Sequence, residues 1–511
     1  MKKKLWALAL AVMLCLAPTV PAAADTTESG VCGESVTWSL DGGILTIGGT
    51  GPMENYRLRT SPWYSQREAI KTVTIKAGVT HIGEYAFYQC SNLTDVQLPA
   101  GLTSVGANAF LECESLKAVT VPDGVEKIGK YAFCTCINLA EVRLPDSITE
   151  IGKCAFSQCE CLKTVNLPDG IPALESNLFS FCKSLTEIEI PDSVTVIGNG
   201  AFSHCSGLTR LRIPAGVTTI GDNAFESCTS LARFETDPNN PSYRSADGIL
   251  YNHDFTELVR CPCTYSGDFA VPDSVVRILG YAFQGCTGLT NVSVPGSVAE
   301  IGSYAFQGCE KLTVLRLPMG LTGIARAMLA DCTALTSLWV PAGVTRIEEY
   351  ALWDCDKLRD IYYEGSSKQW AAILVEDYND RLSAALMHFD FAFSGGVTVT
   401  VKDIPVQWTD VEPFIDANNR TMVPFRAVAE TLGLDVNWDE NAREAVFSNG
   451  DQAIYFPIGS NVARTSEGRT VTMDTAAVIV SDRTFAPVRA LAEYFGYWVD
   501  WDPDLRCVLI G

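Results

Sequence analysis

The chain has 511 residues, with 60 acidic against 38 basic side chains and a formal net charge of −22. This length exceeds one ordinary domain, so several domains or a repeat array are expected. The acidic balance argues against nucleic acid and anionic membranes as partners, because both are bound through basic patches.

Residues 1–24 have the order of a secretory signal peptide. Three lysines at 2–4 precede an apolar run over 5–17, and alanines at 22–24 precede Asp25. The run is too short to span a bilayer comfortably, and no second run of about 18 or more apolar residues follows, so no transmembrane anchor is expected. Cleavage near residue 24 removes the three lysines and gives a net charge of −25.

A 23-residue period governs residues 71–360. Leucine follows each cysteine of the period three residues later. Phenylalanine stands three residues before the cysteine in nine repeats, and Leu329 and Leu352 take this position in the last two repeats. A fixed period of this size is the signature of a solenoid, in which stacked turns share one core. The eleven ladder cysteines are Cys90, Cys113, Cys136, Cys159, Cys182, Cys205, Cys228, Cys286, Cys309, Cys332 and Cys355.

Each turn divides into two predicted parts. The Leu-x-x-Val-x-Leu-Pro segment at 93–99 predicts a short strand ended by proline. The Val-x-x-Ile-Gly-x-x-Ala-Phe segment at 125–133 is expected to close the coil, with Gly129 at a turn.

The ladder cysteines have two interpretations. Nineteen cysteines in an exported chain suggest a disulfide framework. However, an evenly stacked column does not obviously offer the geometry that disulfides or metal sites need. We therefore favour buried core residues with weak S–H donors.

The period breaks at about 237–271. The spacing between Cys228 and Cys286 is 58 residues, where two periods would give 46. Asp247-Gly248 stands between apolar flanks and predicts a hairpin, so a structural kink or protrusion is expected here. Cys261 and Cys263 also fall in this segment, near His253. A metal or redox role or a local disulfide for them stays open.

The repeats resemble the BspA-type leucine-rich repeat family of bacterial surface proteins, and the pattern covers roughly residues 70–360. Residues 25–70, with Trp38 and Trp63, look like the N-terminal cap of that family, and residues 361–393, with Trp370, look like its C-terminal cap. The resemblance implies a β-rich leucine-rich-repeat solenoid with capping segments, on an exported surface protein.

After a linker at 394–396, residues 397–511 carry a different duplication. The motif Arg-Thr-x-x-Pro-x-Arg-Ala-x-Ala-Glu-x-x-Gly at 420–433 recurs at 483–496, and each copy is followed by Trp-Asp. The motif predicts a turn, a short helix, a glycine stop and a strand, and hence a small α+β domain. The arginine and glutamate of each helix stand four residues apart and are interpreted as ion-paired scaffold residues: Arg426 with Glu430, and Arg489 with Glu493. The alternative is that the arginines and tryptophans of the module form a ligand site.

This module resembles the copper amine oxidase N-terminal-like, or stalk, domain. The residues do not support copper chemistry, because the four histidines are scattered and none lies in the module. Phosphate-loop, metalloprotease and nucleophile-elbow motifs are also absent from the sequence. We therefore assign no catalytic residue, cofactor or metal ligand. The histidines are His81, His204, His253 and His388.

The strand segments define a candidate ligand-binding face. If Val96 and Leu98 point inward, Gln97 points outward, and the equivalent positions form a row about 50–60 Å long. Trp339 and Tyr362 are expected to form an exposed aromatic hot spot at its end. An ordinary solvated strand face is the alternative. The row is Gln97, Thr120, Arg143, Asn166, Glu189, Arg212, Glu235, Ser293, Arg316, Trp339 and Tyr362.

The sequence thus predicts a secreted, extracellular or envelope-associated binding or adhesion protein whose partner is an extracellular protein, a glycan or the cell wall. The alternative is a structural envelope component that the C-terminal domain attaches to the cell wall. An enzyme is a remote third hypothesis.

Overall fold

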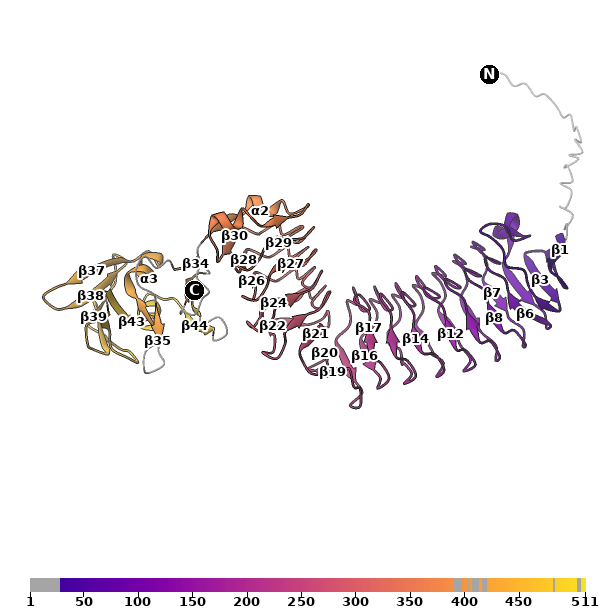
Figure 1. Ribbon diagram of the computed structural model, residues 1–511, viewed down its shortest axis with the longest axis horizontal. Helices are drawn as coiled ribbons and strands as arrows, with labels where there is room; N and C mark the ends of the chain where they lie inside the picture. The colour runs from indigo at the N-terminus through magenta and orange to yellow at the C-terminus, as the bar shows by residue number, and fades with distance from the viewer. Residues whose placement is uncertain are drawn as a thin grey trace, which may run out of the picture.

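The computed structural model describes residues 28–389, 398–402, 404–406, 413–415, 421–480, 483–502 and 507–511. The predicted signal peptide at 1–24 and the linker at 394–396 lie outside these residues. Stacked turns form a solenoid in two curved blocks, which meet at an insert, and a small β-rich domain follows (Figure 1). The predicted fold class is confirmed.

The Leu-x-x-Val-x-Leu segments form the first strand column. Its parallel strands are shifted by one period, so that Val142 pairs with Val119. The first block contributes β5 (Thr72–Ile75), β7 (Asp95–Gln97), β9 (Ala118–Thr120), β11 (Glu141–Arg143), β13 (Thr164–Val165), β16 (Arg210–Ile213) and β18 (Arg233–Thr236). The second block contributes β22 (Ser266–Ala270), β24 (Gly288–Ser293), β26 (Val314–Arg316), β28 (Ser337–Val340), β30 (Asp360–Tyr363) and β32 (Leu386–His388).

The Val-x-x-Ile segments and their equivalents form the second strand column. In the first block these are β4 (Gly51–Pro52), β6 (Val79–Ile82), β8 (Ser104–Val105), β10 (Lys127–Ile128), β12 (Glu150–Ile151), β14 (Ala173–Leu174), β15 (Val196–Ile197) and β17 (Thr219–Ile220). In the second block they are β23 (Arg277–Ile278), β25 (Glu300–Ile301), β27 (Gly323–Ile324), β29 (Arg346–Ile347) and β31 (Leu374–Val375).

A proline interrupts the second strand column between β12 and β14. The N–H of Thr149 donates to the carbonyl of Glu126, and the N–H of Thr195 donates to the carbonyl of Pro172, each at 2.9 Å. Pro172 occupies the equivalent position between them and has no N–H. The ladder therefore lacks one bond at this turn.

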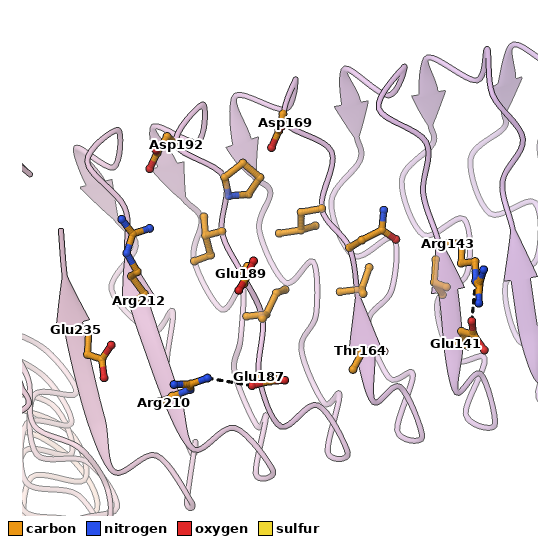
Figure 2. A pocket seen from close by; sticks show the side chains of 17 residues that line it. Glu141, Arg143, Thr164, Asp169, Glu187, Glu189, Asp192, Arg210, Arg212 and Glu235 are labelled. Atoms are coloured by element: carbon orange, nitrogen blue, oxygen red, sulfur yellow. Dashed lines mark hydrogen bonds and ion pairs between the residues drawn. The ribbon is translucent and has the colours of Figure 1, made fainter.

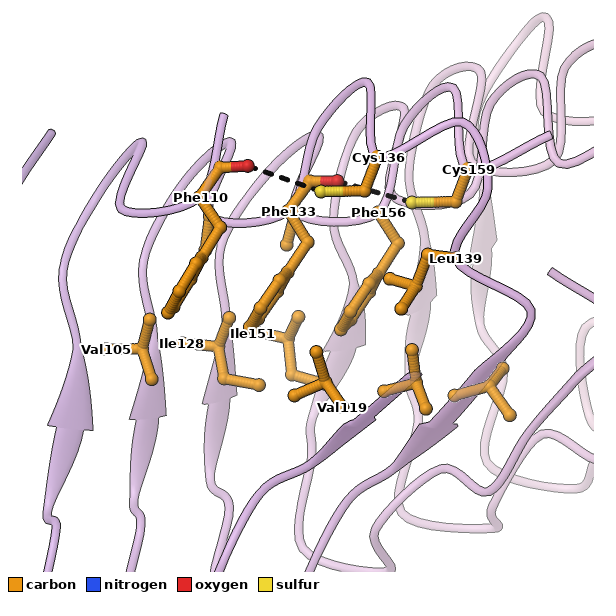
Figure 3. Packing of buried hydrophobic residues seen from close by; sticks show 14 of the residues in the cluster. Val105, Phe110, Val119, Ile128, Phe133, Cys136, Leu139, Ile151, Phe156 and Cys159 are labelled. Atoms are coloured by element: carbon orange, nitrogen blue, oxygen red, sulfur yellow. Dashed lines mark hydrogen bonds between the residues drawn. The ribbon is translucent and has the colours of Figure 1, made fainter. Parts of the chain in front are cut away.

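Phenylalanine side chains stack along the core between the two columns (Figure 3). Each fully buried ring contributes about 1.5–3 kcal/mol through removal of apolar surface from water. The ring centroids lie 4.9 Å apart for Phe87 and Phe110, and 6.2 Å apart for Phe202 and Phe225. Adjacent strands lie about 4.8 Å apart, so the turns spread on the phenylalanine side and the block curves.

The ladder cysteines are buried free thiols, which confirms their interpretation as core residues. Cys136 Sγ donates to the carbonyl of Phe110 at 3.2 Å, and Cys159 Sγ donates to that of Phe133 at 3.3 Å (Figure 3). Each such carbonyl also accepts the N–H of the cysteine in its own turn. Cysteine fits this position because it is small, apolar and still a weak donor. Burial raises the pKa of Cys90 to about 12.

Gly129 does not serve the turn conformation that the sequence suggested, and its φ is not positive. A Cβ at this position would lie 2.5 Å from the backbone nitrogen of Ala107 in the preceding turn. Glycine is therefore needed because two backbones pass close to each other. Over residues 125–135 the left-handed positions belong to Tyr131 and Thr135.

Aromatic residues close both ends of the solenoid. At the N-terminal end, β1 (Glu28–Gly33), β2 (Val36–Asp41), β3 (Ile44–Gly49) and the 3-10 helix η1 (Tyr64–Ala69) precede the first repeat. Trp63 is fully buried, stacks on Phe87 at 5.7 Å and donates its Nε1–H to the carbonyl of Ala86. At the other end lie α1 (Ser367–Trp370) and α2 (Arg381–Ala384), and Trp370 packs edge-on against Tyr363.

The insert consists of β19 (Tyr243–Ala246), β20 (Ile249–Asn252) and β21 (Glu257–Arg260). β19 and β20 pair antiparallel around Asp247-Gly248, both with positive φ, which confirms the predicted hairpin.

Arg260 is buried and joins the two blocks. Its guanidinium donates to the carbonyl of Phe225 at 3.2 Å and to the carbonyl of Gln284 at 2.9 Å.

The C-terminal domain pairs the two copies of the duplicated motif. Val423 in β36 (Thr421–Pro424) lies opposite Ala486 in β43 (Arg483–Pro487), and α3 (Phe425–Thr431) and α4 (Val488–Tyr494) follow these strands. Gly433 and Gly496 end the helices with positive φ, as predicted. The strands are β33 (Thr398–Val401), β34 (Ile404–Pro405), β35 (Phe414–Ile415), β36 (Thr421–Pro424), β37 (Asp435–Asp439), β38 (Glu444–Ser448), β39 (Ala453–Pro457), β40 (Val462–Thr465), β41 (Thr470–Thr472), β42 (Val478–Val480), β43 (Arg483–Pro487), β44 (Val499–Asp502) and β45 (Cys507–Ile510).

Candidate binding face

The first strand column brings the predicted row together in two parts. Arg143 pairs with Thr120 across β11 and β9, and Arg212 pairs with Glu235 across β16 and β18. The insert separates Glu235 from Ser293. The exposed members are Gln97, Thr120, Arg143, Asn166, Glu189 and Arg212. The half-buried members are Glu235, Ser293 and Arg316.

The aromatic end of the row is not exposed. Trp339 is 3% and Tyr362 is 2% exposed. Their rings stack at 4.6 Å, the guanidinium of Arg316 lies over Trp339, and the His388 ring stacks on Tyr362. The expectation of a solvent-exposed aromatic hot spot at this end is therefore wrong, because neighbouring turns cover both faces of the pair.

A groove of about 920 Å³ lies on the first strand column of the first block (Figure 2). Its lining extends from β11 to β18 and includes five predicted face residues: Arg143, Asn166, Glu189, Arg212 and Glu235. Six carboxylates and three guanidinium groups line it, and we call it the acidic groove. The carboxylates are those of Glu141, Asp169, Glu187, Glu189, Asp192 and Glu235.

The strand ladder is open at the centre of the acidic groove. In this fully described stretch, residues 187–190 form no strand and make no backbone hydrogen bond to either neighbouring turn. The ladder is also interrupted between β7 and β9. The opening exposes the edges of apolar side chains: Leu167 keeps 9% and Val165 8% of its surface exposed, against 0% for Ile213 in β16. The acidic groove thus has an apolar floor and a charged rim.

Other polar residues that the sequence drew attention to are structural. Arg489 is ion-paired with Glu493 at 3.0 Å, as predicted. The equivalent ion pair predicted between Arg426 and Glu430 is wrong, because these two described side chains form no ion pair. Within the described ranges, no group of three or more His, Cys, Asp or Glu side chains is placed to hold a metal ion.

The Cys-x-Cys of the insert lies beside the buried arginine. Cys261 and Cys263 are buried free thiols, and Cys263 Sγ accepts a hydrogen bond from Arg260 at 3.2 Å. His253 instead contacts Arg244 and Asp254 at the surface.

None of the helices in the described part of the chain has the length and apolarity needed to cross a membrane.

Comparison with known proteins agrees with this architecture. The model of the BspA type leucine-rich repeat region matches residues 61–182, 126–245 and 261–372, and that of the copper amine oxidase N-terminal domain matches residues 400–510. Among curated proteins, no significant match was found.

Three solved structures illustrate the likeness. A leucine-rich cell surface protein from Faecalibacterium prausnitzii is 32% identical, with a TM-score of 0.57, and the alignment covers 69% of this chain and 99% of that one. A leucine-rich repeat protein from Eubacterium ventriosum is 24% identical (TM-score 0.42, 72% and 96% covered). One from Bacteroides ovatus is also 24% identical (TM-score 0.44, 70% and 98% covered). The chain therefore belongs to the BspA-type leucine-rich repeat family, with a copper amine oxidase N-terminal domain at its C-terminal end.

Proposed function

We propose that the protein is an exported bacterial surface protein that binds an extracellular protein or glycan through the first strand column of its first block. The C-terminal domain acts as a spacer or as an attachment to the envelope. The family membership and the cell surface protein from Faecalibacterium prausnitzii support the surface location. The observation that carries the binding role is the acidic groove, because it coincides with five residues of the variable row.

Exposure along the row favours the first block over the second. The six exposed members all precede the insert, whereas the members after it are half-buried or buried. A macromolecular partner needs an interface of roughly 800 Å² on each side, which only a contiguous exposed face supplies. The exposed row from β7 to β16, with the acidic groove at one end, is such a face.

A catalytic role is less well supported by the side-chain geometry. His81 lies between Ser104 and Asn55, which is reminiscent of a Ser-His-Asn triad. Its Nδ1 lies 2.8 Å from Ser104 Oγ and its Nε2 lies 3.1 Å from Asn55 Oδ1. The serine therefore meets the opposite ring nitrogen from the one that activates it in serine proteases. The contact connects three successive turns, and we assign it a structural role.

The test is a binding screen with one variant of the proposed face and one control variant of the second strand column. The chain from residue 25 onward is applied to an array of extracellular matrix proteins and glycans. A triple variant, Arg143→Ala, Glu189→Ala and Arg212→Ala, removes exposed side chains from the first strand column. The control, Glu126→Ala, Lys127→Ala and Glu150→Ala, removes exposed side chains from the second strand column or its immediate flank.

The proposal predicts that the first variant loses binding to the array and the control retains it. Equal loss in both variants, or the absence of any array partner for the wild-type chain, would contradict it. Circular dichroism of both variants confirms that the solenoid is folded before the comparison is made.

A further inference from the structure

The charges of the acidic groove are not balanced within the molecule. Each of its three arginines already has an acidic partner. Arg143 lies 2.7 Å from Glu141, Arg210 lies 3.3 Å from Glu187, and Arg212 lies 2.5 Å from Asp237.

Three carboxylates of the acidic groove have no basic partner. In this fully described part of the chain, no lysine, arginine or histidine nitrogen lies within 4.0 Å of Asp169, Glu189 or Asp192, and all three side chains are exposed. Asp169 and Asp192 stand along one rim, and Glu189 lies between that rim and the Glu187–Arg210 pair (Figure 2). The uncompensated negative charge therefore lies along one rim and at the centre of the open part of the strand ladder.

The floor between these carboxylates is apolar. Val165, Leu167 and Ile188 each keep 7–9% of their surface exposed where the ladder opens. A side chain that fits both parts needs an aliphatic stem, which packs on the floor, and a cationic head, which reaches the rim. Lysine and arginine have this construction. The backbone N–H and C=O groups of residues 187–190 also make no backbone hydrogen bond to a neighbouring turn.

Resting on the proposed function, we infer that the acidic groove binds an extended, lysine- or arginine-rich segment of a partner protein. Charge complementarity selects the occupant, since the unpaired carboxylates favour cations and the chain is acidic overall. An extended segment fits because Asp169 and Asp192 hold equivalent positions in two successive turns about 5 Å apart, with Glu189 in the same turn as Asp192. Side chains on one face of an extended peptide recur about every 6–7 Å, which is close to this spacing.

The direct probe is a dodecapeptide of alternating lysine and alanine, with an alternating glutamine and alanine peptide of equal length as control. Binding to the chain from residue 25 onward is measured by fluorescence anisotropy at 50 and 200 mM salt. The groove variant carries Asp169→Asn, Glu189→Gln and Asp192→Asn. The matched variant carries Asp273→Asn, Glu300→Gln and Glu310→Gln, which neutralises three exposed carboxylates of the second block.

The groove variant is expected to bind the lysine peptide about tenfold more weakly, because three charge pairs with the peptide are lost. The matched variant, with the same net charge, should change affinity by less than about twofold, and affinity should fall at the higher salt concentration. Equal weakening in both variants, or equal binding of the glutamine peptide, would overturn the inference.

The outcomes also separate this inference from the proposed function. If a glycan or a neutral protein from the array binds the first strand column and the groove variant retains that binding, the cationic occupant is wrong and the proposed function stands. If the lysine peptide binds only through the acidic groove and no array partner depends on Arg143, Glu189 or Arg212, the inference stands and the proposed role of the wider face is wrong.

Discussion

Arg260 connects the two blocks of the solenoid, and its replacement by methionine tests how they are held together. Methionine keeps an apolar stem and removes the guanidinium. The guanidinium donates to the carbonyl of Phe225 in the first block and to the carbonyls of Tyr281 and Gln284 in the second. The substitution therefore deletes hydrogen bonds that cross the insert.

The expected loss of local stability is about 2–4 kcal/mol. A hydrogen bond to a charged donor contributes about 1.5–3 kcal/mol. The sum of three is reduced by two effects. First, each carbonyl keeps a second donor, such as the N–H of Cys228 for Phe225. Second, a buried guanidinium carries a desolvation cost that methionine lacks, and its Nε has no partner in the described part of the chain.

Hydrogen exchange monitored by mass spectrometry measures this loss directly. In a solenoid each turn contacts mainly its neighbours, so a weakened joint opens locally. Amides of β18 and β23 should exchange about 30- to 1000-fold faster in Arg260→Met, which corresponds to the stated free energy. Arg244→Met, in the exposed hairpin of the same insert, should leave these rates unchanged. Unchanged exchange in Arg260→Met, or equal acceleration in both variants, would refute the reasoning.

Three further predictions concern the solenoid core. Gly129→Ala should lower the free energy of unfolding, measured by urea titration, by about 1–3 kcal/mol because the new Cβ meets backbone. In the control Gly296→Ala the new Cβ meets nothing within 4 Å, so the free energy of unfolding should change by less than about 1 kcal/mol. Similar losses in both variants would contradict the close-approach explanation. Trp63→Ala should cost about 3–5 kcal/mol and accelerate hydrogen exchange in β5 and β7 first; protection that persists there would show that the cap does not hold these turns. Iodoacetamide at pH 8 should modify Cys161, which is half-buried, whereas the ladder cysteines should react only on unfolding. Burial raises the pKa of the ladder cysteines, to about 12 for Cys90, and so keeps them as unreactive thiols. Rapid labelling of ladder cysteines in the native chain, read by peptide mapping, would contradict their place in the core.

Much of the solenoid could be predicted because its determinants repeat. Stacking in register puts equivalent residues in one column, so the period alone places phenylalanine, leucine and cysteine inside and Gln97 or Thr120 outside. The hairpin at Asp247-Gly248 was predictable for a similar reason, because its turn conformation is encoded locally. Pro172 carries a signal that went unused, since proline has no N–H to donate to the ladder.

Other features depend on contacts between turns that no single repeat encodes. The strand pattern predicted Trp339 as exposed, but Arg316 and Tyr362 from adjacent turns cover its ring. Residues 187–190 have the pattern of a regular strand, yet the ladder opens there and creates the acidic groove. The burial of Arg260 was not predictable, because three of its acceptors are backbone carbonyls, which leave no mark in the sequence.

The central claim, that the first strand column of the first block binds the partner, is tested most directly by hydrogen exchange of the chain from residue 25 onward, with and without its best array partner. Protection should concentrate in residues 141–143, 164–169, 187–192 and 210–213. Protection confined to the second strand column, or to residues 398–511 in the C-terminal domain, would contradict the claim.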